Sequence, residues 1–170
     1  LSAEDYDEIK DVIGLGISED IEDRSTPLLY IAQTGSKQMK KQKPEFIEGL
    51  AVGNSFNNIT GQYWDTESTP LELVPCFFRA NWLEWTPVNA GGGFHGMHPR
   101  NTPLVREGIA RDGRRDVVDL RNGHELVLTH HYFCILAGSL KPIVVPMSSS
   151  NLGASAKIQT LLSERTGQTP

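Results

Sequence analysis

Apolar and polar residues alternate along residues 70–85, PLELVPCFFRANWLEW, which is the pattern of a β-strand with one buried face. The even positions from Val74 to Trp82 form a nearly unbroken apolar face. The odd positions mix apolar side chains with Arg79, so the opposite face is expected to be partly exposed. Pro75 predicts an edge strand or a β-bulge within this segment, because proline cannot donate a hydrogen bond to a sheet.

Shorter apolar runs and a change of period predict the remaining elements. Strands are expected at residues 28–33, 122–136 and 142–147, a hairpin at residues 52–64, and a short N-terminal helix at residues 3–13. After Ser148 the apolar period lengthens to about 3.6 residues, which predicts a C-terminal helix. Many strands without alternating helices favour a mainly β (α+β) fold, an OB-like antiparallel barrel.

The composition is that of a globular protein, because 38% of the 170 residues are hydrophobic and 22% are charged. The net charge of −5 arises in residues 1–24, which hold nine acidic and two basic residues, whereas the rest of the chain is mildly basic. Such asymmetry is typical of nucleic-acid proteins, although a solvated acidic helix fits the acidic segment equally well. We therefore divide the chain into an acidic N-terminal arm, residues 1–27, and a single β-rich OB-like domain, residues 28–170.

The two cysteines and the lack of a long apolar run bear on the compartment. No run approaches the roughly 20 apolar residues that a membrane-spanning helix needs. Cys76 and Cys134 each lie inside an apolar run and have no metal-clip or redox spacing. They are expected to be buried free thiols in a reducing environment. These patterns predict a cytoplasmic protein without a membrane partner.

The segment 86–121 is rich in glycine, proline and arginine and is expected to form one long loop, either a basic flap or a solvated connection. Its glycines lack the Lys-Ser/Thr that follows a phosphate-binding loop. His95 and His98 supply two metal ligands where zinc needs three or four, so a metal-assisted nuclease stays an alternative. No serine or cysteine lies in a nucleophile motif. We expect no cofactor, no metal and no catalytic residue.

Single-stranded DNA binding needs cationic side chains for the phosphates and aromatic rings for base stacking, and the chain offers both. Lysines cluster at residues 37–43, arginines in the segment 86–121, and aromatic residues on the two longest predicted strands. The candidate nucleic-acid-binding residues are Lys37, Lys40, Lys41, Lys43, Phe77, Arg79, Trp85, Arg100, Arg106, Arg111, Arg114, Arg115, His131 and Phe133. Strand aromatics also fit a plain core, and the charged loop also fits a solvated surface.

Five stretches in this order resemble a family of tailed-bacteriophage proteins: YIAQTGSKQMKKQKPEFIEGLAVGNSFNNITGQYW, LELVPCFFRANWLEWTP, GGGFHGMH, NGHELVLTHHYFCIL and PIVVPMSSSNL. The resemblance covers about residues 28–165. Genes of that family commonly lie among replication and recombination functions, and its members are often labelled single-stranded-DNA-binding or left unassigned. Members tend to continue past the helix with a further β-segment, so the resemblance implies a C-terminal truncation.

The leading hypothesis is therefore single-stranded DNA binding in phage DNA replication or recombination, in the host cytoplasm. The first alternative is a protein–protein adaptor or inhibitor that docks on a replication enzyme through the acidic arm. The second is the metal-assisted nuclease. The expected partners are single-stranded DNA and phage or host replication and recombination proteins, and the protein is free to form an oligomer.

Overall fold

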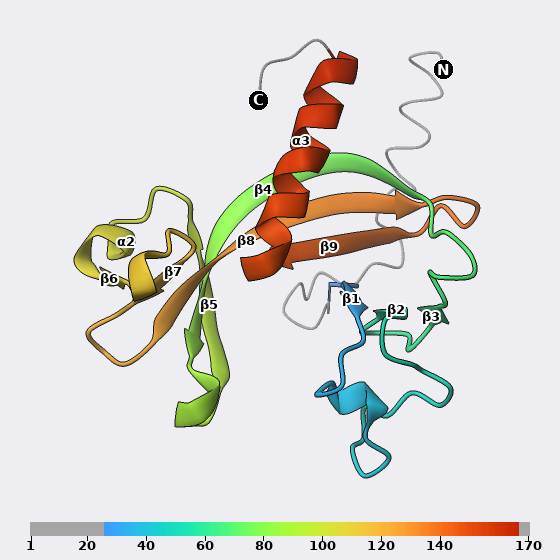
Figure 1. The fold of residues 1–170 in the computed structure, drawn as a ribbon, viewed down its shortest axis with the longest axis horizontal. Helices are drawn as coiled ribbons and strands as arrows, with labels where there is room; N and C mark the ends of the chain where they lie inside the picture. The colour runs from blue at the N-terminus through green and yellow to red at the C-terminus, as the bar shows by residue number, and fades with distance from the viewer. Residues whose placement is uncertain (1–25, 167–170) are drawn as a thin grey trace, which may run out of the picture.

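Two antiparallel sheets and a C-terminal helix make up the part of the chain that the computed structural model describes, residues 26–166 (Figure 1). The larger sheet has six strands in the order β5-β4-β8-β7-β6, with β9 also paired to β8. They are β4 (Leu73–Thr86), β5 (Gly93–Pro99), β6 (Ile109–Ala110), β7 (Val117–Asp119), β8 (Glu125–Leu136) and β9 (Pro142–Ser148). The predicted antiparallel, mainly β fold with a C-terminal helix is confirmed; the predicted helix at residues 3–13 lies outside the described residues.

A smaller sheet of three short strands lies against the β9 edge of the larger one. It consists of β1 (Leu29–Ile31), β2 (Ser55–Asn57) and β3 (Tyr63–Trp64), and the predicted hairpin is confirmed by the antiparallel pairing of Phe56 with Tyr63. A parallel bridge from Leu28 to Val144 joins the two sheets. The start of the described chain therefore lies along the edge of β9 that is not paired with β8.

The predicted bulge at Pro75 is present, and it changes which face of β4 is buried. The register between β4 and β8 shifts between Pro75 and Phe77, which leaves Cys76 as the extra residue. Leu73, which precedes the bulge, and Phe78, which follows the bulge, pack against the same core. The regular alternation predicted that Val74 and Cys76 lie on the apolar face with Phe78. This prediction is wrong for both residues, because the one added residue reverses the alternation. Cys76 is consequently exposed, whereas Cys134 is buried as expected.

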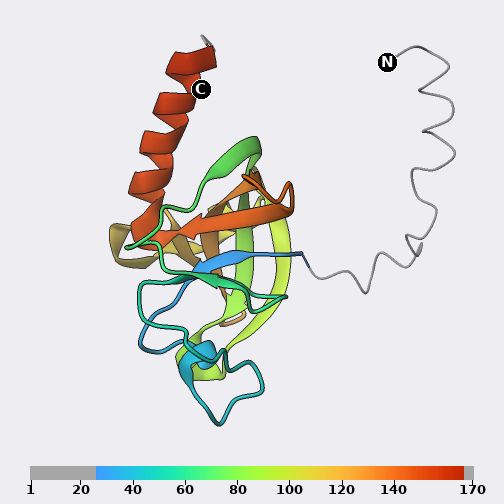
Figure 2. The same ribbon diagram turned by 90° about the vertical axis from the view of Figure 1, so that its right-hand side faces the viewer.

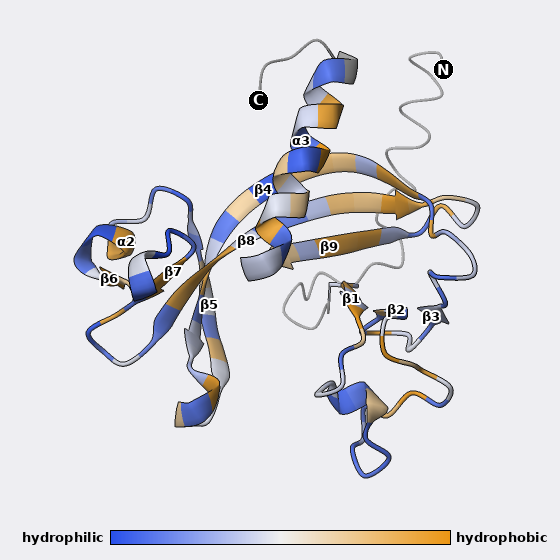
Figure 3. Ribbon diagram, in the orientation of Figure 1, coloured by the Kyte–Doolittle hydropathy of each residue, from blue (hydrophilic) through white to orange (hydrophobic). Residues whose placement is uncertain are grey.

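The helix α3 (Leu152–Thr166) crosses one face of the large sheet (Figures 1 and 2). Ile158 and Leu162 of the helix pack on a core that includes Tyr132 and Ile143. The Tyr132 hydroxyl donates to the Ser155 carbonyl oxygen over 2.9 Å, and the Ser155 hydroxyl lies 2.7 Å from Nδ1 of His130. We call this side of the sheet the helix face. Apolar residues concentrate along β4, β8 and β9, whereas most loops are polar (Figure 3).

The segment 86–121 differs from the single long loop expected for it. Residues 93–99 form β5, which pairs with β4 from Asn81 to Thr86, and β6 and β7 follow around the short helix α2 (Leu104–Glu107). A second core forms here from Trp82, Val118 and Leu126. Pairing with β4, rather than the local glycine-rich sequence, determines that residues 93–99 form a strand.

Replacement of Gly108 by alanine is expected to destabilise this second core by about 1–3 kcal/mol, because overpacking forces backbone or side-chain shifts. A Cβ atom at Gly108 would lie 2.8 Å from the Asp119 carbonyl oxygen and would also clash with the Val118 side chain. Denaturant unfolding of the two proteins measures the difference. Gly96→Ala is the matched control, since a Cβ there meets nothing within 4 Å; equal losses from both variants would contradict the packing described.

Candidate nucleic-acid interface

The face of the large sheet opposite α3 carries an open groove of about 560 Å³. After the bulge, the odd-numbered residues of β4 and β8 point to this face, because the even-numbered Tyr132 and His130 contact α3. Side chains from β1, β5 and β9 complete the lining. We call this site the aromatic groove, defined by Tyr30, Arg79, Asn81, Leu83, Trp85, Phe94, Met97, His131, Phe133, Val144 and Pro146 with Thr26 and Leu28.

Four aromatic rings line the groove, and three of them are well exposed. Tyr30 is 41% exposed, Phe94 56% and Phe133 37%, whereas Trp85 is half-buried. The Trp85 and Phe94 rings pack with their centroids 5.0 Å apart. Exposed rings that are already held by neighbours lose little conformational freedom when a planar ligand stacks on them.

Arg79 is the cation of this groove, and the lining contains no acidic residue. Its guanidinium carbon lies 5.5 Å from the centroid of the Phe77 ring, and Phe77 in turn packs against Phe133. Burial lowers the pKa of His131 and raises the pKa of Tyr30, so both are neutral at pH 7. The groove therefore presents one positive charge among neutral aromatic and apolar groups.

Two buried polar atoms belong to residues of the groove and have no hydrogen-bond partner among the described residues. They are Oδ1 of Asn81 and Nδ1 of His131. Unpaired buried polar atoms are rare in folded proteins because each costs about 1–3 kcal/mol. Such exceptions are often associated with functional sites, and both residues line this groove.

The sequence-predicted site residues do not form one site. Arg79, Trp85, His131 and Phe133 line the aromatic groove, and Phe77 packs against Phe133 beside it. Arg100, Arg114 and Arg115 line a different pocket on the helix face. Lys37, Lys40, Lys41 and Lys43 are exposed around the turn at Lys37–Met39, and Arg106 is exposed on α2; none of the five lines the groove.

Arg111 lies outside both sites, and its guanidinium already has anionic partners. It forms ion pairs with Asp119 and, at 2.6 Å, with Glu125. Both bonds hold the pKa of Arg111 above its usual range, and the bond to Asp119 has the larger effect. A phosphate at this position would have to displace a carboxylate that is fixed in the sheet.

The histidines His95 and His98 have different partners on the helix face. His98 Nε2 donates to a Glu84 carboxylate oxygen at 2.8 Å, and His95 Nε2 lies 2.6 Å from the Thr86 hydroxyl. Nδ1 of His124 forms a second hydrogen bond to the Glu84 carboxylate, at 2.6 Å. This hydrogen bond is the main reason why the pKa of the Glu84 carboxyl is lowered. Among residues 26–166 no group of three or more His, Cys, Asp or Glu is arranged to hold a metal ion.

Sequence reasoning missed several lining residues, among them the exposed Tyr30, Phe94 and Met97. Phe94 and Met97 lie in the glycine-rich stretch that was expected to be irregular, and only their pairing with Trp85 and Leu83 brings them to the groove. Tyr30 arrives from the small sheet. The sequence carries no signal that groups Phe94 with Met97, because residues three positions apart lie on opposite faces of a regular strand. The irregular pairing of β5 with β4 between Glu84 and Trp85 places both on the same face.

Comparisons with known proteins give one match. Residues 9–170 match the family model described as "Pam3 phage gp34-like protein". No curated protein and no solved structure matches the chain. No helix within residues 26–166 is both long and apolar enough to cross a membrane.

Proposed function

The chain belongs to the Pam3 phage gp34-like family and is thus a bacteriophage protein, and we propose that it binds single-stranded DNA in the aromatic groove during phage DNA replication or recombination. The observation that carries the proposal is the combination of exposed rings with Arg79 in a lining free of acidic residues. Proteins that bind single strands with little sequence preference combine aromatic rings, on which bases stack, with cations for the phosphates.

The shape of the groove also supports a single strand over a duplex. It is open along one face of the antiparallel sheet, and its rings come from different strands: Tyr30 from β1, Trp85 from β4, Phe94 from β5 and Phe133 from β8. Stacking on such rings requires bases whose faces are accessible, and the bases of a duplex are already stacked on one another. A single strand therefore gains more from this surface than a duplex does.

A protein–protein adaptor is the second candidate, because Phe77, Phe94 and Met97 leave apolar surface exposed around the same groove. Contiguous exposed apolar surface marks protein contacts as well as ligand grooves. The acidic arm that the sequence analysis assigned to docking lies almost wholly outside the described residues.

Titration of the whole chain with a fluorescent single-stranded oligonucleotide tests the proposal. We expect saturable binding that weakens with added salt, with a log–log slope of about −0.7 for each phosphate contacted. The tryptophan fluorescence should change in the same titration, because Trp85 lines the groove. A duplex of the same sequence is the control ligand, and we expect it to bind more weakly than the single strand. Absence of binding at low salt would leave the adaptor as the better hypothesis.

A further inference from the structure

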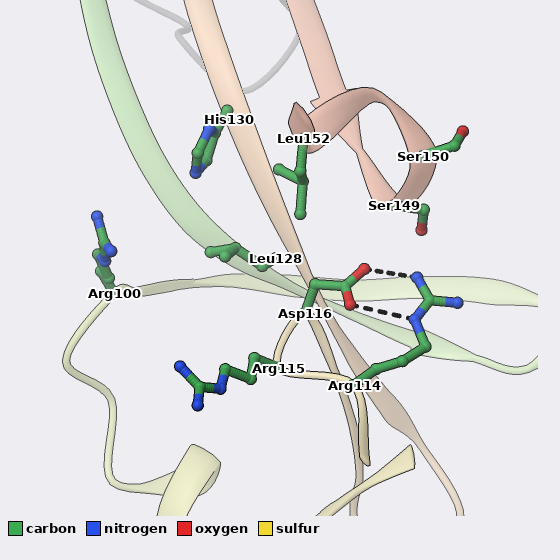
Figure 4. Close-up of a pocket in the computed structure, with 9 residues that line it drawn as sticks. All are labelled: Arg100, Arg114, Arg115, Asp116, Leu128, His130, Ser149, Ser150 and Leu152. Carbon is green, nitrogen blue, oxygen red and sulfur yellow. Dashed lines mark hydrogen bonds and ion pairs between the residues drawn. The ribbon is translucent and has the colours of Figure 1, made fainter. Parts of the chain in front are cut away.

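A second pocket, of about 660 Å³, lies on the helix face, between the end of β5 and the start of α3. Figure 4 shows the residues that line it. The lining combines Arg100, Arg114 and Arg115 with His130 on β8 and with Ser149 and Ser150, which precede α3. The even-numbered His130 faces α3, so this pocket and the aromatic groove lie on opposite faces of the sheet. We call it the arginine pocket.

The arginine pocket holds more positive than negative charge. Asp116 is its acidic lining residue, and that carboxylate pairs with Arg114 at 2.5 Å. Arg100 and Arg115 have no ion pair with any residue in the described part of the chain. In the view of Figure 4 both extend on the other side of the pocket from Arg114. Two guanidinium groups are thus available to an anion that enters the pocket.

Hydroxyl groups complete the set of donors. Ser149 and Ser150 are exposed at the short helical turn that leads into α3, and no side chain caps this turn. Ser149 has a φ of 49°, in the left-handed region, which is uncommon for a residue other than glycine. Left-handed residues that are not glycine concentrate at binding sites, where the surrounding structure holds the strained conformation.

We propose that the arginine pocket is a binding site for a phosphate group, with Arg100 and Arg115 as its charged donors and the serine hydroxyls as neutral ones. Guanidinium groups match the oxygen geometry of phosphate and remain charged at all relevant pH values. The phosphate belongs to a free anion or nucleotide, or to a DNA strand that continues around the sheet. The inference does not depend on the aromatic groove, because the two sites share no lining residue.

Inorganic phosphate is the first probe, and calorimetric titration of the whole chain is the measurement. Wild-type protein is expected to bind phosphate, and the double variant Arg100→Ala/Arg115→Ala should bind it at least about a hundredfold more weakly, about tenfold for each charged hydrogen-bonding group. Both side chains are exposed, so the variant should retain the fold. Arg121→Ala/Lys141→Ala is the control, since it removes the same two positive charges from exposed positions outside the pocket.

Equal loss of phosphate binding in the two double variants, or no binding by wild-type protein, overturns the proposal. Oligonucleotide titrations then identify the source of the phosphate. If the site holds DNA backbone, the Arg100→Ala/Arg115→Ala variant also loses oligonucleotide affinity and salt dependence; if it holds a free anion or nucleotide, oligonucleotide binding is unchanged. Failure of the groove proposal is distinguishable, because it would leave phosphate binding and its dependence on the two arginines intact.

Discussion

Replacement of both Phe94 and Phe133 by leucine is expected to weaken single-stranded DNA binding by about a hundredfold, although leucine preserves the apolar character of the groove. Loss of base–aromatic stacking costs about 1–3 kcal/mol for each base, which is roughly five- to 150-fold in affinity for each lost ring, so about a hundredfold for two rings lies within this range. Both side chains are more than one-third exposed, so the substitutions should leave the free energy of unfolding nearly unchanged. Fluorescence titration and thermal unfolding of the same preparations measure the two quantities.

This substitution also separates the two candidate functions, because a protein partner that docks on apolar surface would tolerate leucine. Tyr63→Leu is the matched control: it removes an aromatic ring that is 40% exposed but lies outside the groove. We expect Tyr63→Leu to bind DNA as the wild type does. DNA affinity retained by the Phe94→Leu/Phe133→Leu variant would argue against stacking and in favour of the adaptor.

The strands that could be predicted from the sequence are those that carry their own pattern. β4 and β8 alternate apolar and polar residues over many positions, and α3 shows a helical period, so local sequence was sufficient for each. β5 carries three glycine and proline residues among seven, and its strand conformation depends on hydrogen bonds to β4. Such non-local pairing leaves little local signal.

The candidate site was predictable to the same extent. Phe77, Arg79 and Trp85 were assigned to one face of a strand by their odd spacing, and the structure places them together with His131 and Phe133 from the paired strand. The arginines of the segment 86–121 were grouped with them by composition alone. Composition cannot show which side of a sheet a connection crosses, and this one brings Arg100, Arg114 and Arg115 to the helix face.

The consequence for mechanism is that Arg79 carries the electrostatic part of groove binding. Replacement of Arg79 by glutamate is expected to reduce affinity for single-stranded DNA by at least about a hundredfold, close to 2.7 kcal/mol, because a carboxylate would then face phosphates in a groove without another cation. Arg79 is exposed and takes part in no ion pair among the described residues, so the substitution should not disturb folding.

Salt dependence gives the mechanistic form of this prediction. Arg79→Ala should reduce the magnitude of the log–log salt slope by about 0.7, the contribution of one phosphate contact to a single strand, whereas Arg79→Lys should preserve the slope. Arg79→Lys is nevertheless expected to lower affinity, since an ammonium group lacks the planar fork of arginine. Arg121→Glu makes the same charge change outside the groove and is the control. If Arg79→Glu and Arg121→Glu lower affinity equally, only the overall charge of the protein matters and the DNA does not lie over Arg79.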